Sequence, residues 1–357
     1  MKTGLELALP RISARRALIA RVQIWIGLLL IGLLAQPSVV RGQSVVLVGS
    51  GSTVPAPLYS HWAEEYGKRN SKFQMRYVPI GTEQGIKQIA QGSGDFSAGE
   101  APLSEEQRRN DGLIEVPAVL IGIVPIYNLP EVHQDLKLSG EVLAEIYLGV
   151  VKTWDAPQIA KLNPEVSLPN AAIRVIYRPE GKGSNFVFTD FLSKTSAKFR
   201  AQIGVSPSPK WPVGESAERS SDMADKVKST PGSIGYVEYQ YAVKSNIRQA
   251  AVLNAAGKFV KASPPGLLSA CEEVESPRWH NFSASLVNAR GVDSYPITSF
   301  TWIYLRAKPL DPTRAAALDN WLSWGYSDGQ TVAEKDGYTG LPPQLLTEVK
   351  RKLNELH

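Results

Sequence analysis

The sequence predicts an α/β fold with mostly parallel or mixed sheets, on the basis of three observations. Strand-like and helix-like segments alternate along most of the chain. The run VPAVLIGIVPIYN (116–128) is almost entirely apolar, as in strands that are covered on both faces. Several strand-like segments end in turns rich in glycine and hydroxyl residues that lead into helices. In such folds, ligands bind beyond the carboxyl ends of strands, where helices begin.

The first predicted unit is a strand, a turn and a helix. Val45 to Val48 are apolar, and Gly49 to Thr53 form a glycine-serine turn. Leu58, Trp62 and Tyr66 follow at a four-residue spacing, which places them on one helix face, and Gly67 can close that helix. The next unit has the same order, since FQMRYVPIG (73–81) alternates like a strand and TEQGIKQIAQG (82–92) is helical.

The later elements continue this alternation. After the apolar run, SGEVLAEIYLG (139–149) predicts a helix that is capped by Ser139 and ends at Gly149. IRVIYR (173–178) predicts a strand and SNFVFTDFLSK (184–194) a helix, and ITSFTWIYLR (297–306) predicts a long late strand. Two amphipathic helices close the chain, one with Leu318, Trp321 and Leu322 and the other with Leu345, Leu346, Val349 and Leu353. We assign most aromatic side chains to the core because they follow helix or strand spacing.

Residues 1–42 have the pattern of a secretory signal peptide. Four arginines precede an uncharged, mostly apolar run from Ile24 to Ala35, which is short for a membrane span. We expect cleavage near Gly42 or slightly earlier and a periplasmic protein; the alternative is a retained N-terminal anchor. The only cysteine is Cys271, so we expect neither a lipid-anchored N-terminal cysteine nor an internal disulfide.

Removal of this segment changes the charge balance. Six of the 39 basic residues and one of the 34 acidic residues lie in residues 1–42, so 33 of each remain. The high sequence pI therefore belongs to the export segment, and no nucleic-acid partner is expected. The remaining 315 residues are enough for two lobes with separate cores.

Three strand-turn-helix junctions share one chemistry. They are Ser52-Thr53-Val54, the segment Gly81 to Gly85 around Thr82, and the segment Arg178 to Asn185. Each supplies hydroxyl groups and backbone N–H groups at the start of a helix, and the third adds the cations of Arg178 and Lys182. A single Ser or Thr at such a place is more often an ordinary N-cap. Together, the three junctions indicate a site for a small anion.

A carboxylate near this site can explain selectivity. Glu100 lies in DFSAGEAPLSEEQ (95–107), whereas Asp95 in the same stretch is interpreted as a turn or cap residue. Phosphate at neutral pH keeps a P–O–H donor that an ionised carboxylate can accept, and sulfate has none. A mismatch of this kind can discriminate by roughly 10⁴ or more.

No pattern for catalysis is found. The sequence contains no G-x-S-x-G, Walker A or H-E-x-x-H motif, and its four histidines are scattered. We therefore expect no enzyme activity, no cofactor and no metal site. A phosphate-ester hydrolase on the same fold is kept as an alternative, but it needs a nucleophile or metal that the sequence does not nominate.

Long segments of the chain resemble the periplasmic phosphate-binding protein of phosphate ABC importers. These segments include GSGSTVPAPLYSHWAEEY, IGTEQGIKQIAQGSGDFSAGEAPLS, IYLGVVKTWDAPQIAKLNP, KWPVG, PGSIGYVEYQYA and YPITSFTWIYL, and the resemblance runs from about Val48 to the C-terminal helices. It implies a two-lobed, venus-flytrap fold, with a mixed, mostly parallel sheet in each lobe and phosphate bound between the lobes. The expected lobes are 43–125 with 296–357, and 126–295.

The resemblance also implies roles for individual residues. The hydroxyl and N–H of Thr53, the N–H of Val54 and the hydroxyl of Thr82 would bind phosphate, and Glu100 would accept its proton. Arg178 would be the binding arginine, and Gly183 and Ser184 would donate from the third turn. Ser52, Glu180 and Lys182 are less certain members of the site. The implied partners are inorganic phosphate and the permease and ATPase subunits of an ABC importer, and a monomer is expected.

The chain departs from the family at several positions in the site turns and near them. Its third turn reads RPEGKGSN where the family usually has a sequence like RADGSGTS, so Lys182 replaces a ligand serine and Glu180 an arginine-orienting aspartate. Glu83-Gln84 replaces a small pair, and Glu215 to Ser220 replace a glycine-rich stretch. Glu180 and Lys182 could instead neutralise each other at the rim. Three competing hypotheses stay open: the ligand is another protonated oxyanion, the ligand is a phosphorylated metabolite, or bound phosphate serves as a signal.

Overall fold

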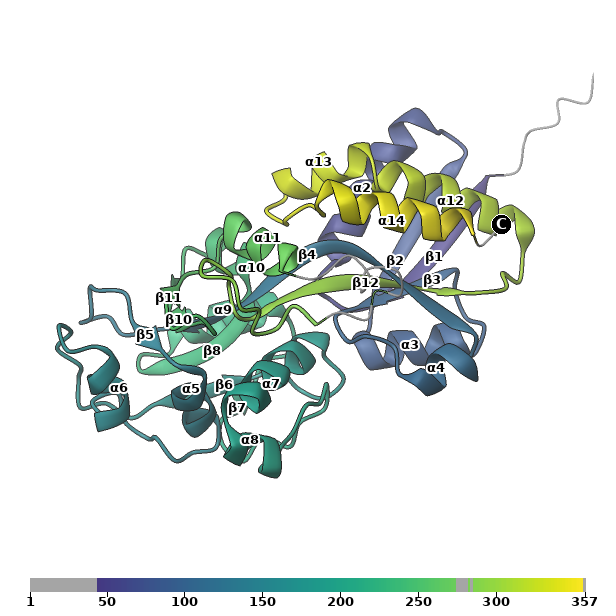
Figure 1. The fold of residues 1–357 in the computed structure, drawn as a ribbon. Coiled ribbons are helices and arrows are strands. Elements are labelled where there is room, and N and C mark those ends of the chain that lie inside the picture. The colour runs from purple at the N-terminus through teal and green to yellow at the C-terminus, as the bar shows by residue number, and fades with distance from the viewer. Residues whose placement is uncertain (1–43, 274–281, 283–284, 356–357) are drawn as a thin grey trace, which may run out of the picture. The chain divides into compact units, whose positions relative to one another are not determined.

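The computed structural model describes residues 44–273, 282 and 285–355 (Figure 1). The signal segment expected at 1–42 lies outside the described residues. Within these residues there is one nine-stranded sheet, with the main strand order β2-β1-β3-β12-β4-β8-β6-β7, and one three-stranded sheet. No helix in this part of the chain is long and apolar enough to cross a membrane.

The first half of the structure, built on one half of the nine-stranded sheet, contains both the first and the last described elements, β1 and α14. Its strands are β1 (Val45–Gly51), β2 (Phe73–Pro79), β3 (Phe96–Gly99), β12 (Thr298–Arg306) and the first part of β4 (Leu113–Tyr127). β1 is parallel to β2 and β3, whereas β12 is antiparallel to β3 and β4. The helices of this half are α2 (Ala56–Arg69), α3 (Thr82–Ala90), α4 (Glu105–Arg109), α12 (Pro312–Gly325), α13 (Asp328–Lys335) and α14 (Pro343–Asn354). Figure 1 shows α3 and α4 on one side of the sheet and α2 and α12 to α14 on the other.

The second half is built from the middle of the chain. Its strands are the end of β4, β6 (Arg174–Tyr177), β7 (Glu215–Ser216), β8 (Ser233–Glu238) and β9 (Arg248–Gln249). Its helices are α5 (Gly140–Tyr147), α6 (Pro157–Leu162), α7 (Gly183–Thr195), α8 (Ala197–Gln202), α9 (Ser220–Ser229), α10 (Tyr239–Lys244) and α11 (Pro264–Glu272). The small sheet contains β5 (Lys137–Leu138), β10 (Ala251–Leu253) and β11 (Phe259–Val260).

Strand β4 joins the two halves. Its residues up to Gly122 pair with β12, and its residues from Ile123 onward pair with β8. The Tyr295 hydroxyl donates to the carbonyl of Ile123 at 2.8 Å, and the Ile123 N–H donates to the carbonyl of Ile297 at 2.9 Å. The chain therefore passes between the halves at two adjacent places, near Gly122-Ile123 and near residues 295–297.

Aromatic side chains fill the core of each half, as the spacing predicted. Tyr59, Trp62, Phe96 and Trp321 pack together in the first half, with ring centroids 5.2–5.9 Å apart for the neighbouring pairs. In the second half, Tyr147, Phe188, Trp211 and Tyr236 form a similar cluster. These rings bury large apolar areas and hold the helices against the sheet.

Several details differ from the sequence prediction, which did not include the helices α4, α6 and α8 to α11. Helix α2 does not close at Gly67 but continues to Arg69, where the N–H of Asn70 donates back to the Gly67 carbonyl. The prediction was wrong because a glycine near a helix end can also keep helical geometry. Helix α13 was not predicted, because its short sequence DGQTVAEK holds only two apolar side chains, Val332 and Ala333, and it buries only Gly329, Gln330 and Ala333.

Candidate anion-binding site

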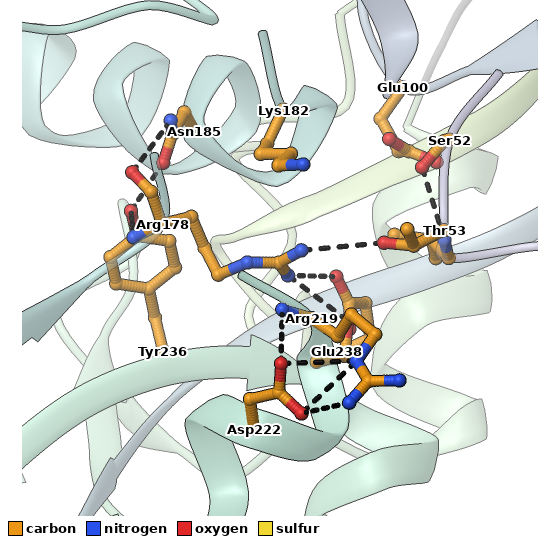
Figure 2. Close-up of polar contacts among 12 residues, drawn as sticks. Ser52, Thr53, Glu100, Arg178, Lys182, Asn185, Arg219, Asp222, Tyr236 and Glu238 are labelled. Atoms are coloured by element: carbon orange, nitrogen blue, oxygen red, sulfur yellow. Dashed lines mark hydrogen bonds and ion pairs between the residues drawn. The ribbon is translucent and has the colours of Figure 1, made fainter. Parts of the chain in front are cut away.

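The three predicted junctions lie together, next to the place where the two halves of the sheet join. The turn after β1, the start of α3 with the end of β3, and the segment between β6 and α7 bring their side chains to one region. Figure 2 shows Ser52, Thr53, Glu100, Arg178 and Lys182 around a common space. Residues far apart in the sequence therefore meet at the ends of strands, as expected for this fold class.

The first turn is fixed by the surrounding structure. The Ser52 N–H donates to the carbonyl of Ala98 at 2.8 Å, and the Tyr77 hydroxyl donates to the carbonyl of Ser52 at 2.9 Å. Tyr338 holds the far end of the turn, because its hydroxyl donates to the carbonyl of Val54 at 2.7 Å. The Val54 N–H, which was expected to face the ligand, donates to Oγ of Ser52 at 3.1 Å. It is therefore engaged inside its own turn.

Thr82 and Glu100 form the second part of the site. Thr82 is the first residue of α3 and Glu100 directly follows β3, and both are fully buried. The Thr82 hydroxyl lies 3.2 Å from Oε2 of Glu100 and donates to it. Oε1 of Glu100 has no hydrogen-bond partner among the described residues.

Burial raises the pKa of Glu100 to about 8. The hydroxyl groups of Ser52 and Thr82 and the charge of Arg178 act in the opposite direction, whereas the carboxylate of Glu238 adds to the increase. At neutral pH Glu100 therefore keeps its proton to a large extent and can donate a hydrogen bond through its hydroxyl. When Glu100 is ionised, its carboxylate can only accept hydrogen bonds.

Arg178 occupies the centre of the site. Nη2 donates to Oγ1 of Thr53 at 3.3 Å and to the carbonyl of Glu218 at 2.9 Å, and Nη1 donates to Oγ of Ser220 at 3.1 Å. The side chain is buried, yet its Nε has no hydrogen-bond partner in the described part of the chain. A buried guanidinium with an unused donor is suited to an anion that is recognised by several oxygens.

The start of α7 packs directly against Glu100. A methyl group added at Gly183 would lie 2.0 Å from Oε2 of Glu100 and 2.6 Å from Oγ1 of Thr82, so only glycine fits there. The next residue, Ser184, is buried, and its hydroxyl lacks a hydrogen-bond partner within the described chain. The N-terminus of this 13-residue helix therefore points its first groups at the site.

The two charged replacements in the third turn do not pair with each other. Lys182 is buried and forms an ion pair with Glu218. Glu180 is exposed and forms an ion pair with Lys210. The alternative that Glu180 and Lys182 neutralise each other was therefore wrong. In the residues that the structure describes, Glu180 has no contact that would orient Arg178. The geometry of the turn explains this, because two residues that flank Gly181, with its φ of 78°, point in different directions.

A further contact ties the α3 junction to the third turn. The Glu83 N–H donates to the carbonyl of Gly181 at 3.3 Å, and Oε2 of Glu83 accepts from the Ser208 hydroxyl at 2.7 Å. Ser208 Oγ in turn accepts from the N–H of Gly181 at 2.8 Å. The long side chain of Glu83, one of the departures from the family pattern, is thus used to join two parts of the site.

Two further residues shape the site: Glu238, which sequence reasoning missed, and Asn185, which it included only as the last residue of the third junction. Glu238 at the end of β8 is fully buried, with Oε1 3.9 Å from Nη1 of Arg178 and with neither oxygen hydrogen-bonded in the described residues. Asn185 donates to the carbonyls of Arg178, Pro179 and Pro207, and its own oxygen accepts from Tyr236. Glu238 stands at a fourth strand-helix junction, so the rule that found the other three could have found it.

Asp95 has a structural role, as interpreted from the sequence. It accepts from the N–H of Val48 at 2.6 Å and pairs with Arg314 at 2.5 Å. Cys271 is buried, and burial raises the pKa of its thiol to about 12. Among the described residues, no group of three or more histidine, cysteine, aspartate or glutamate side chains is arranged to hold a metal ion.

Comparisons with known proteins identify the family of the chain. The profile of the PBP superfamily domain matches residues 38–329. The phosphate-binding protein PstS of Pasteurella multocida is 33% identical over 90% of this chain and 94% of its own length. PstS of Haemophilus influenzae is 35% identical over 86% of this chain and 92% of its own length.

A solved structure shows the same fold. The phosphate-binding protein of Stenotrophomonas maltophilia has a TM-score of 0.66 and 17% identity, with 86% of this chain and 93% of that chain covered. The predicted α/β, two-lobed periplasmic-binding-protein fold is therefore confirmed. With the extent and level of identity given above, the chain belongs to the PBP superfamily and, within it, to the family of phosphate-binding proteins of phosphate ABC importers.

Proposed function

We propose that the protein captures inorganic phosphate between two lobes and delivers it to the permease and ATPase subunits of an ABC importer. Its membership of the phosphate-binding protein family supports this function. We assign residues 43–125 and 296–357 to one lobe and residues 126–295 to the other. The lobes close around the anion by a hinge where the chain passes between them, as two-lobed binding proteins do.

Most of the assigned site residues are hydrogen-bond donors to the anion, and one residue, Glu100, shares a proton with it. Arg178 would bind phosphate oxygens through its guanidinium, together with the hydroxyl groups of Thr53, Thr82 and Ser184 and the N–H of Gly183. Ser52 and Val54 would hold the shape of the first turn around them. Glu100 shares one proton with the anion, either by accepting it from a P–O–H group or by donating its own.

One observation carries this assignment. Glu100 and Arg178 are both fully buried, come from distant parts of the chain, and each has a polar atom without a hydrogen-bond partner among the described residues. Buried polar groups are nearly always paired in native proteins, so two unsatisfied groups of complementary chemistry indicate a ligand. A partly protonated tetrahedral oxyanion satisfies both of them.

Calorimetric titration tests this function directly. The mature protein, stripped of bound anion by unfolding and refolding, would be titrated at pH 7 with phosphate and then with sulfate. We expect tight phosphate binding and a weaker response to sulfate, with a difference that widens as pH rises toward and above 8, where Glu100 ionises. If phosphate gives no heat at several temperatures and does not raise the unfolding temperature, the proposed function is wrong.

Cell fractionation and sizing test the remaining parts of the proposal. We place the protein in the periplasm after removal of an N-terminal signal and expect a monomer. A mature N-terminus near Gly42 in the periplasmic fraction would support the location. A particle mass of one chain in solution would support the monomer, and loss of phosphate uptake on deletion would support transport over sensing.

A further inference from the structure

Lys182 is buried next to the residues of the anion site, although its ion-pair partner, Glu218, is mostly exposed. The side chain of Lys182 is 11% exposed, whereas that of Glu218, with which it forms an ion pair, is 66% exposed. Figure 2 shows the ammonium group of Lys182 directed into the space that Arg178, Thr53 and Glu100 also face. Lys182 directly precedes Gly183, which packs on Glu100.

The segment that holds Lys182 also holds Arg178. The Glu218 carbonyl accepts from Nη2 of Arg178 at 2.9 Å, the Ser220 hydroxyl accepts from Nη1 at 3.1 Å, and the Glu218 carboxylate pairs with Lys182. Residues 218–220 thus present a carbonyl, a hydroxyl and a carboxylate oxygen to the two cations of the site. Of these three, only the carboxylate sits on a long, mostly exposed side chain that can turn away.

We propose that Lys182 is a second anion-binding cation of the phosphate site and that Glu218 is its internal competitor, which the incoming anion displaces. This inference rests on the proposed function and deepens it. In the bound state the ammonium of Lys182 donates to an anion oxygen, and the Glu218 carboxylate moves into solvent. The carbonyl of Glu218 and the hydroxyl of Ser220 keep their contacts with Arg178.

The energetics favour this exchange. An ion pair with a mostly exposed carboxylate contributes little, since solvent and salt screen it. A charge-assisted hydrogen bond from the same ammonium to an anion inside the closed site is stronger, because water is excluded there. Loss of Glu218 should therefore tighten phosphate binding by about two- to fivefold. Loss of the Lys182 charge should weaken it by about tenfold or more.

A double-mutant cycle tests the coupling. Phosphate affinity would be measured by calorimetry at pH 7 and low salt for wild type, Glu218→Gln, Lys182→Gln and the double variant. We expect Glu218→Gln to tighten binding in the wild-type background and to have no effect in the Lys182→Gln background. Raising the salt concentration should reduce the gain from Glu218→Gln, because salt weakens the competing pair.

Glu215→Gln is the matched control. Glu215 lies three residues before Glu218, is similarly exposed and pairs with Lys226 at 2.7 Å. It should change phosphate affinity by less than about twofold in either background. Circular dichroism and the unfolding temperature of each variant would verify that all of them fold.

The outcomes of the cycle separate the two proposals. If wild type binds phosphate but Glu218→Gln weakens binding, or acts equally with and without Lys182, the competitor role is wrong while the proposed function stands. If Lys182→Gln binds as tightly as wild type, Lys182 is not a phosphate ligand. If wild type itself does not bind phosphate, the proposed function fails before the cycle begins.

Discussion

Glu238 lies 3.9 Å from Arg178, measured from Oε1 to Nη1, and the exposed fractions of the two side chains are 0% and 1%. Arg178 directly follows β6 and Glu238 ends β8, so two neighbouring strands place a cation and an anion in the interior. Removal of one partner of a buried pair leaves an uncompensated charge, which is costly. Glu180, which replaces the arginine-orienting aspartate of the family, is exposed and pairs with Lys210 instead.

We therefore predict that Glu238→Ala destabilises the protein by about 3–5 kcal/mol in phosphate-free buffer. Phosphate should restore part of this loss, because the anion would compensate the charge of Arg178. Urea unfolding with and without phosphate measures both effects. Glu180→Ala is the control and should cost less than about 1 kcal/mol, because its ion pair with Lys210 is exposed. Equal losses for the two variants would contradict the assigned role of Glu238.

The sequence predicted the elements of the fold well because their signals are local. The apolar run that becomes β4 and the spacing of Leu58 and Trp62 in α2 are readable within a few residues. The same applies to the junctions around Thr53, Thr82 and Arg178, since a strand end followed by a helix start is a local pattern. Helix α13 was missed because its eight residues include only two apolar side chains, Val332 and Ala333, which are too few for a pattern to be recognised.

The ion-pair partners could not be predicted, because they depend on where distant segments meet. Lys182 and Glu180 are two residues apart, and sequence proximity suggested that they pair. In the structure, Lys182 pairs with Glu218, 36 residues away, and Glu180 pairs with Lys210, 30 residues away. Such pairings follow from the direction of each side chain around a turn, which the residue types alone do not encode.

Glu100 should make the stability of the phosphate-free protein depend on pH. Its pKa is about 8 in the folded protein and 4.5 as the ordinary value, so the folded state binds the extra proton. Below about pH 4.5 both states are protonated and Glu100 has no effect. As pH rises toward 8, the folded state progressively loses relative stability, by several kcal/mol in total at about 1.4 kcal/mol per pKa unit.

Glu100→Gln removes this titration. We expect the variant to gain stability relative to wild type as pH rises from about 5 to about 8, and the gap to level off above that. Urea unfolding at several pH values in phosphate-free buffer measures the gap. Glu115, whose pKa burial also raises, is present in both proteins, so its contribution cancels in the difference. A gap that does not change with pH would show that Glu100 does not titrate in this range.

We also predict that titration of Glu100 makes the selectivity for phosphate over sulfate increase with pH. Protonated Glu100 can donate to a sulfate oxygen, whereas ionised Glu100 repels sulfate but still accepts the P–O–H group of phosphate. Because the pKa is about 8, sulfate affinity should fall by up to about tenfold between pH 6 and pH 9, and phosphate affinity should fall much less.

Calorimetric competition titrations with sulfate and phosphate across this range measure the selectivity. In Glu100→Gln, the side-chain amide can donate at every pH, so sulfate binding should become nearly independent of pH. Sulfate binding to wild type that stays constant from pH 6 to pH 9 would rule out the proton-sharing role of Glu100.

Gly183 is the position where the site tolerates least change. A methyl group there would approach Oε2 of Glu100 to 2.0 Å, Oγ1 of Thr82 to 2.6 Å and the backbone nitrogen of Glu100 to 2.8 Å. The backbone atom cannot rotate away as a side chain can, so α7 and the Glu100 segment must move apart. We predict that Gly183→Ala weakens phosphate binding at least roughly hundredfold, because a shift of about 1 Å disrupts several hydrogen bonds to the anion at once.

Gly67→Ala is the matched control for Gly183→Ala, since a methyl group at this helix position has no neighbour nearer than 3.8 Å. Alanine there should stabilise the protein by about 0.5–1 kcal/mol, because it is the better helix former, and should leave phosphate affinity unchanged. Calorimetry and thermal unfolding of both variants separate loss of the site from loss of the fold. If Gly183→Ala binds phosphate like wild type, the start of α7 does not contact the anion, and the donors assigned to Gly183 and Ser184 would have to be withdrawn.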